Sequence, residues 1–202
     1  MEFLQAQRID SCLYLDSDTL LYIDVTQDRK KFDLYDFTLS HGMSGCTCFV
    51  NRVGAIEEYC QLVWDIYSGK DGYNYNKLVS HYAVRKRNGL DGGACDMTVF
   101  ELFRTERFGS IGEAGLIIDG SVYDPNISLP VPGFEMQDGI KKVTWRDGLP
   151  YGRHLRTGQD VRLNSLQFQG RMKHLMQRFY TGDARYVNEA SPDDPKELIG
   201  AQ

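Results

Sequence analysis

The stretch that most constrains the fold is an apolar run interrupted by two acidic residues. The residues over Cys12–Leu15 are mostly apolar, Asp16 and Asp18 follow, and a second apolar stretch begins at Leu20. Ionised carboxylates are costly to bury unless they are compensated. The pattern therefore predicts a short buried strand over Cys12–Leu15 that delivers both carboxylates to the end of a sheet.

Two carboxylates so close together repel each other, and a divalent cation is their natural compensator. Mg²⁺ and Mn²⁺ prefer oxygen ligands and are commonly bound by one or two carboxylates together with phosphate oxygens. Ligands of α/β proteins bind beyond the carboxyl ends of the strands. Asp16 and Asp18 are therefore candidate metal ligands, and the alternative that these residues leave open is a solvated turn.

Strand-like and helix-like segments alternate along the rest of the chain, which predicts a mixed α/β fold. Apolar residues recur at three- and four-residue steps from Val53 to Tyr67, which predicts a helix that Gly69 ends. We expect a hairpin around the turn at residues 146–148. Tyr151, Arg153 and His154 belong either to this exposed hairpin or to a loop that closes over a ligand. Other predicted strands cover 46–51, 116–118 and 161–168, and other predicted helices cover 76–86, 94–103 and 172–179.

The charge balance argues against nucleic acid as a partner. The 202 residues include 23 Lys and Arg against 28 Asp and Glu, a formal net charge of −5. We interpret the tightest basic cluster, Arg85–Arg87, as a solvated helix end. Because no apolar run approaches the roughly 20 residues of a membrane span and the five cysteines suit buried thiols, we expect a cytoplasmic protein.

Two further segments carry candidate ligand-binding residues. A strand stops at Gly170 and a helix begins, where backbone N–H groups and Lys173 can hold a phosphate. Asp96 follows a glycine-rich turn and begins another helix, so its carboxylate is a candidate to line a cleft. The alternatives are an ordinary strand–glycine–helix connection and an acid placed favourably at a helix N-terminus.

The stretch LYLDSDTLLYIDV, from Leu13 to Val25, resembles the DxD region of nucleotide-sugar glycosyltransferases with the GT-A fold, closest to the family 8 type. The resemblance implies that Asp16 and Asp18 bind Mn²⁺ or Mg²⁺, which holds the diphosphate of a nucleoside-diphosphate sugar, with Ser17 beside this donor. Met43–Asn51 resembles the strand that lines the donor and acceptor cleft in such enzymes. Asp96 matches an acid that either accepts the acceptor's proton or holds a sugar hydroxyl.

The segment QFQGRMK is similar to the family's H-F-x-G-x-x-K motif near its C-terminus. The resemblance implies that Gly170 and Lys173 meet the donor diphosphate. Gln167 stands where the family has a histidine that is the third metal ligand. A neutral amide is a weaker ligand for Mn²⁺ than an imidazole is, so this substitution weakens the expected metal site.

The resemblance implies a GT-A-like mixed sheet flanked by helices, with a catalytic domain over residues 1–187 and a flexible tail over 188–202. Only 15 residues precede Asp16, whereas these enzymes carry the first half of their nucleotide-binding sheet there. We therefore expect a fold that is incomplete at the N-terminus. An open sheet edge and a separate chain that supplies the missing half follow from this expectation.

The function implied is transfer of a sugar from a nucleoside-diphosphate donor to a hydroxyl of a carbohydrate or other acceptor. One alternative is a non-catalytic remnant of such an enzyme that binds carbohydrate or a partner chain. Another is a phosphatase of the haloacid-dehalogenase type. Its DxDGT signature places Thr four residues after the first Asp, whereas Thr19 lies three after Asp16 and the Gly is missing.

Overall fold

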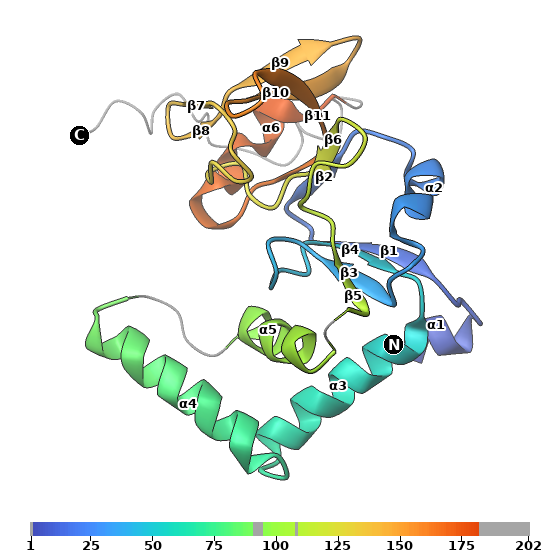
Figure 1. The fold of residues 1–202 in the computed structure, drawn as a ribbon, viewed down its shortest axis with the longest axis vertical. Coiled ribbons are helices and arrows are strands. Elements are labelled where there is room, and N and C mark those ends of the chain that lie inside the picture. Colours follow the sequence, from blue (N-terminus) through green and yellow to red (C-terminus); the bar gives the residue numbers. More distant parts are fainter. Residues whose placement is uncertain (1, 91–94, 108, 182–202) are drawn as a thin grey trace, which may run out of the picture.

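The computed structural model describes residues 2–90, 95–107 and 109–181, and it shows a mixed α/β architecture (Figure 1). This confirms the fold class at the level of helices combined with mixed sheets. The predicted glycine-rich turn at residues 91–93 and the predicted tail over 188–202 lie outside the described residues. None of the described helices is both long enough and apolar enough to cross a membrane.

The first sheet has the strand order β1-β4-β3-β5 in the part of the chain that is described. It comprises β1 (Cys12–Leu15), β4 (Thr47–Val50), β3 (Phe37–Leu39) and β5 (Ile111–Glu113). β1 and β3 run antiparallel to β4, whereas β5 runs parallel to β3. Among the described strands β1 pairs only with β4, so β1 is one edge of this sheet and β5 is the other.

The second sheet is built around the longest described strand, β11 (Gln159–Gln167). β11 lies between β2 (Thr19–Leu21) and β10 (Leu149–His154), and β10 pairs with β9 (Val143–Arg146) to form the predicted hairpin. β6 (Ser121–Tyr123) pairs with β11 in parallel. A separate two-stranded sheet joins β7 (Met136–Gln137) to β8 (Ile140–Lys141).

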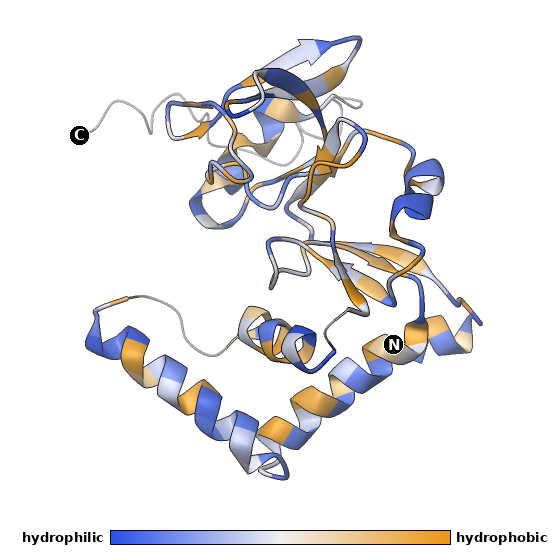
Figure 2. Ribbon diagram, in the orientation of Figure 1, coloured by the Kyte–Doolittle hydropathy of each residue, from blue (hydrophilic) through white to orange (hydrophobic). Residues whose placement is uncertain are grey.

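The helices lie mostly against the first sheet. α3 (Val53–Tyr67) and α5 (Asp96–Glu106) contribute Ala55 and Phe103 to a core shared with β3, β4 and β5. α4 (Gly72–Arg87) packs on α3, and Figure 2 shows hydrophobic and hydrophilic residues alternating along both helices. The remaining short helices are α1 (Glu2–Ala6), α2 (Val25–Asp28), η1 (Arg29–Phe32), η2 (Gly170–Leu175) and α6 (Met176–Phe179).

The two acidic residues lie where the chain passes from one sheet to the other. β1 ends at Leu15 in the first sheet and β2 begins at Thr19 in the second, so residues 16–18 form the crossing turn. The Asp16 N–H donates to the Cys46 carbonyl oxygen at 3.0 Å, and the Phe168 N–H donates to the Asp18 carbonyl oxygen at 2.8 Å. Backbone hydrogen bonds therefore fix this turn to both sheets.

Some sequence predictions are wrong. No strand covers 116–118, because the Ile118 N–H bonds to the Ser121 carbonyl oxygen at 2.9 Å and closes a turn there. The strands are β5 and β6, on either side of that turn. Tyr151, Arg153 and His154 lie in β10 rather than in a loop, and His154 is buried with its ring contacting Thr157 and the Pro132 carbonyl.

The apolar face predicted for α3 is wider than the face that is buried. Ala55 and Ile66 are buried, whereas Cys60, Trp64 and Tyr67 are exposed. The helix runs out beyond the first sheet, so its outer turns have less of the molecule to pack against (Figure 1). The last predicted helix is also shorter, because η2 has 3₁₀ geometry and only α6 is α-helical.

A buried ion pair stabilises the loops behind the crossing turn. Lys141 Nζ lies 2.7 Å from Asp124 Oδ1, and neither side chain is exposed to solvent. Lys141 also donates to the Asn126 carbonyl oxygen at 2.6 Å, while Asp124 Oδ2 accepts the N–H of Gln167 at 3.3 Å. Burial raises the pKa of Asp124, which Lys141 partly opposes. The pair connects β8, β6 and the end of β11.

We expect Lys141→Met to lower the free energy of unfolding by about 3–5 kcal/mol, because it leaves the carboxyl of Asp124 buried without its cation. Urea unfolding followed by circular dichroism measures this change. Asp160→Asn is the control, because it removes the ion pairs with Arg146 and Arg153 on an exposed surface and costs far less. Equal stability of Lys141→Met and wild type would show that the pair does not hold these loops.

Candidate functional site

Asp18, Gln167 and Lys173 form a cluster in which one carboxylate has two partners. Asp18 Oδ1 accepts a hydrogen bond from Gln167 Nε2 at 2.9 Å, and Asp18 Oδ2 lies 3.1 Å from Lys173 Nζ. The Asp18 side chain is 13% exposed, whereas that of Lys173 is 60% exposed. The structure therefore brings together an acid, an amide and a cation that lie about 150 residues apart in the sequence.

The register of the second sheet creates this cluster. Thr19 and Leu20 of β2 pair with Gln167 and Leu166 of β11, which places the residue before Thr19 beside the end of β11. The hydroxyl of Thr19 also donates to Gln167 Oε1, so both atoms of the amide are bonded. Because Phe168 is fully buried, the chain after Gln167 stays close to the core.

A turn at Gly170 directs the chain after β11 back toward Asp18. The φ of Gly170 is +61°, a left-handed conformation that residues with a Cβ adopt only at a cost. The turn begins η2, and Lys173 reaches Asp18 from this short helix. The predicted position of Gly170 between strand and helix is thus observed, although it is followed by a 3₁₀ helix rather than an α-helix.

Asp16 is bonded separately, to Tyr14. The Tyr14 hydroxyl donates to Asp16 Oδ1 at 2.9 Å. This hydrogen bond is the main cause that raises the pKa of Tyr14 to about 12, and burial and the charges of Asp16, Asp96 and Cys48 add to it. Asp96 lies in the first turn of α5, is exposed, and is close enough for its charge to act on Tyr14. No hydrogen bond in the described residues joins Asp96 to Asp16 or Asp18.

Ser17 lies between the two acids and is exposed. Its side chain makes no hydrogen bond within the described part of the chain, which leaves the hydroxyl open to solvent or to a ligand. The segment Met43–Asn51, of which only β4 is a strand, contributes mainly through Cys46, whose carbonyl oxygen accepts from the Asp16 N–H and, at 3.4 Å, from the Thr19 hydroxyl.

A cavity lies next to this segment. It has a volume of about 350 Å³ and is lined by the turn at His41–Gly42, by Arg104 and Glu113, and by Pro125 and Pro132, among others. Glu113 fixes the turn, since its carboxylate accepts the N–H groups of His41 at 2.7 Å and Gly42 at 2.6 Å. The thiol of Cys46 lies 3.9 Å from the Pro125 carbonyl oxygen, which connects the cavity wall to the crossing turn.

The donor set of the site suits a hard divalent cation. Asp16 and Asp18 offer carboxylate oxygens, the ligand type of Mg²⁺ and Mn²⁺, and such ions keep other positions for water and phosphate. Gln167 does not match the third ligand that the resemblance implies, because its Nε2 donates to Asp18 and its Oε1 accepts from Thr19. The described residues contain no group of three or more His, Cys, Asp or Glu that could hold a metal ion. A cation at this turn would therefore have at most the two carboxylates of Asp16 and Asp18 as acidic ligands from the described residues, and water or phosphate oxygens would have to complete its coordination.

Lys173 would compete with such a cation, because its ammonium group already lies 3.1 Å from Asp18 Oδ2. A buried carboxylate needs a compensating charge, and in this structure the ammonium group provides it. Because Lys173 is mostly exposed and its stem is flexible, the ammonium can move to a nearby phosphate when another cation binds Asp18. In the absence of a ligand, the charge of Asp18 is thus balanced by Lys173.

Sequence reasoning missed Tyr14, Thr19 and Asp124. Tyr14 and Asp16 are two residues apart in an extended segment, which places both side chains on one face, so this contact had a signal in the sequence. The contact between Asp124 and the Gln167 N–H had no signal in the sequence, because it depends on how β6 packs beside β11.

Comparisons with protein-family models, with curated proteins and with solved structures find no match to this chain. The functional argument therefore depends on the residues and contacts described above.

We expect Asp16→Asn to lower the pKa of Tyr14 from about 12 toward its ordinary value near 10. A carboxylate beside a phenol disfavours the phenolate, and a neutral amide does not. NMR titration of the ¹³Cζ resonance of Tyr14 measures the shift, and Asp160→Asn serves as a control on a distant surface. An unchanged Tyr14 pKa in Asp16→Asn would show that the two side chains do not interact in solution.

Proposed function

We propose that this chain is a metal-dependent glycosyltransferase with a GT-A-like fold, which transfers a sugar from a nucleoside-diphosphate donor to an acceptor hydroxyl. The observation that carries the proposal is the contact of Asp18 with both Gln167 and Lys173. Those three residues belong to two motifs that the sequence resemblance assigned to one diphosphate site. If the two segments resembled these motifs only by chance, there would be no reason to expect them to be in contact in the structure.

Sugar transfer breaks the bond between the anomeric carbon and the diphosphate, and negative charge develops on the leaving diphosphate. In the proposal, Lys173 leaves Asp18 and its ammonium group binds a phosphate oxygen. Backbone N–H groups at the start of η2 and the hydroxyl of Ser17 bind the same group. Asp16 and Asp18 hold the cation, and bound Mn²⁺ or Mg²⁺ supplies Lewis-acid stabilisation of the diphosphate.

Gln167 has an orienting part in this scheme. Its Nε2 donates a hydrogen bond to Asp18 Oδ1, and its Oε1 accepts one from the Thr19 hydroxyl. These two hydrogen bonds orient the carboxylate in the absence of a ligand. The charge of Asp96 acts on Tyr14, the partner of Asp16, and two roles are open to Asp96 in the proposal. It either accepts the proton of the acceptor hydroxyl or binds a sugar hydroxyl.

The open edge of β1 belongs to the same proposal. An unpaired strand edge offers backbone N–H and C=O groups to a further strand. A strand from a separate chain that paired there would lie beside Asp16 and extend the first sheet. In the proposal this added segment contributes the nucleoside-binding half of the site.

A non-catalytic protein that binds carbohydrate is the second candidate. The bonding of Gln167 favours it, because both atoms of the amide are already used within the protein. Release of free sugar from a nucleotide sugar distinguishes the two, since only an enzyme hydrolyses the donor slowly in the absence of an acceptor. Hydrolysis of an aryl phosphate would instead favour the phosphatase.

Calorimetric titration of UDP- and GDP-sugars with and without Mn²⁺ tests the proposal. We expect wild type to bind one donor class only with the metal, and Asp18→Ala to weaken this binding on the order of a hundredfold, because it removes one of two carboxylate ligands. Asp33→Ala, which removes an exposed carboxylate elsewhere, is the control. Equal heats with and without Mn²⁺ in both wild type and Asp18→Ala would contradict the metal role.

Lys173→Met gives the same experiment a second readout. Titrated with Mn²⁺ alone, the variant binds the ion at least as tightly as wild type, because the competing ammonium is gone. Titrated with donor and Mn²⁺, it binds the donor more weakly, because a charge for the diphosphate is gone. A loss of affinity for Mn²⁺ alone would show that Lys173 does not compete for Asp18.

A further inference from the structure

α4 differs from the rest of the chain in its charge. It contains four of the 23 Lys and Arg residues and no Asp or Glu, its basic residues being Lys77, Arg85, Lys86 and Arg87. The remaining 19 basic residues stand against all 28 acidic residues, so the rest of the chain carries −9. A positive helix on an acidic protein indicates a surface that meets a negatively charged partner.

The same helix exposes large apolar side chains. Only Asn74 and Leu78 of α4 are buried, and Leu78 packs in a cluster with Ile66 of α3 and Val99 of α5. Tyr73 is 71% exposed and Val84 is 51% exposed, and Tyr75, Val79 and Tyr82 are also exposed. α4 lies at the outer edge of the molecule (Figure 1).

The exposed residues follow a helical spacing. Tyr75, Val79, Tyr82 and Lys86 lie four, three and four residues apart, which places them on one face of α4. Lys86 lies over the ring of Tyr82 at 5.7 Å, and on another face Lys77 lies over the ring of Tyr73 at 4.3 Å. Each pair combines an aromatic ring with an ammonium group, so cations border the apolar surface.

We propose that α4 binds the surface of an anionic lipid bilayer and lies in the plane of the interface. Basic residues are attracted to the anionic headgroups, and tyrosine rings are favoured at headgroup depth, where one end of the ring is apolar and the other is wet. The face of Tyr75, Val79 and Tyr82 enters the interface, with Lys86 and Arg87 at its edge. The crossing turn with Asp16 and Asp18 is on a different element and remains free.

The charge segregation favours lipid over the other partners that such a helix attracts. A nucleic acid would require the cations but not the exposed Val79 and Val84. A second copy of α4 would place four cations against four others. An anionic bilayer accommodates both the cations and the apolar side chains, and its attraction acts within roughly 10 Å at 0.1 M salt.

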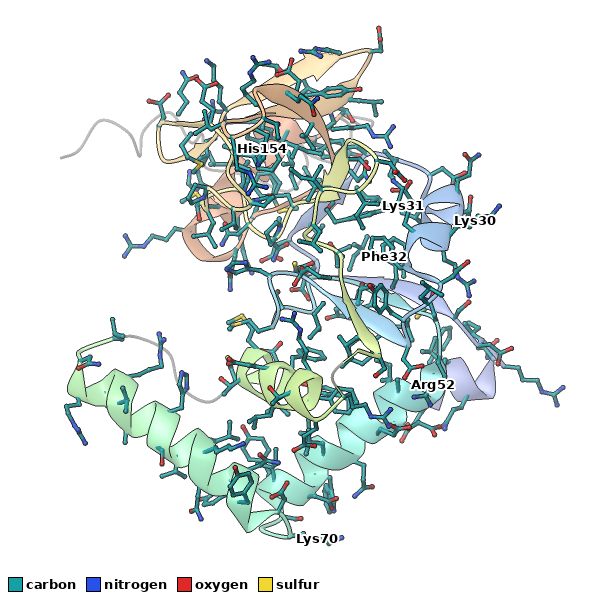
Figure 3. All side chains as sticks on the ribbon, viewed as in Figure 1. Lys30, Lys31, Phe32, Arg52, Lys70 and His154 are labelled. Carbon is teal, nitrogen blue, oxygen red and sulfur yellow. The ribbon has the colours of Figure 1, made fainter. Side chains whose placement is uncertain are left out.

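Sedimentation with vesicles tests the proposal on the full chain. Wild type binds vesicles of mixed phosphatidylglycerol and phosphatidylcholine and does not bind pure phosphatidylcholine. Lys86→Gln with Arg87→Gln weakens the binding roughly thirtyfold, because each basic residue near an anionic surface contributes a factor of about five. Arg8→Gln with Lys30→Gln, which removes the same charge at exposed sites outside α4, leaves binding within a few-fold. Figure 3 shows Lys30 apart from α4.

A second variant separates the apolar contribution from the charge. Val79→Ser with Tyr82→Ser weakens vesicle binding at low and at high salt alike, whereas the loss in the charge variant shrinks as salt rises. Circular dichroism verifies that both variants keep the helix. Equal binding to neutral vesicles, no binding to either vesicle, or an equal loss in the control variant would each overturn the proposal. Binding to duplex DNA as tight as to anionic vesicles would also overturn it, because a general polyanion surface would then explain the helix.

Discussion

The site depends on one constraint, which is that a nearly buried carboxylate must have its charge compensated. Asp18 lies where the chain crosses between two sheets, directly before the pairing of β2 with β11, and its side chain is only 13% exposed. The amide of Gln167 at the end of β11 donates a hydrogen bond to the Asp18 carboxylate, and the ammonium group of Lys173 in η2 balances its charge. The order of the strands, the turn at Gly170 and the burial of Phe168 all serve this arrangement.

The proposed function rests on the same constraint. In the proposal, a divalent cation would replace the ammonium group of Lys173 at Asp18, and the lysine would then bind a phosphate. Behind the cluster, the fully buried pair of Asp124 and Lys141 holds the backbone of Gln167. The exposed lysine is the movable part of the site, and the buried pair is its fixed support.

Local sequence patterns predicted many of the helices and strands, but they could not predict contacts between residues that are far apart in the sequence. The positions of β1, α3 and the hairpin of β9 and β10 follow from local patterns of apolar and turn residues. The burial predicted for β1 is wrong, because none of its four residues is buried and Tyr14 is exposed. The strand expected at 116–118 was wrong because the apolar residues there close a turn. The contacts of Asp18 with Gln167 and Lys173 followed only from the resemblance, and the Asp124–Lys141 pair depends on tertiary packing, which spacing does not encode.

The central claim is that a cation bound at the crossing turn holds a diphosphate, and paramagnetic broadening by Mn²⁺ tests it most directly. In ¹⁵N–¹H spectra with substoichiometric Mn²⁺ and UDP, the account predicts selective loss of the Ser17 amide and the Gln167 side-chain amide signals. Broadening centred instead on another acidic surface, such as Glu57 and Glu58 of α3, with these two signals unchanged, would contradict it.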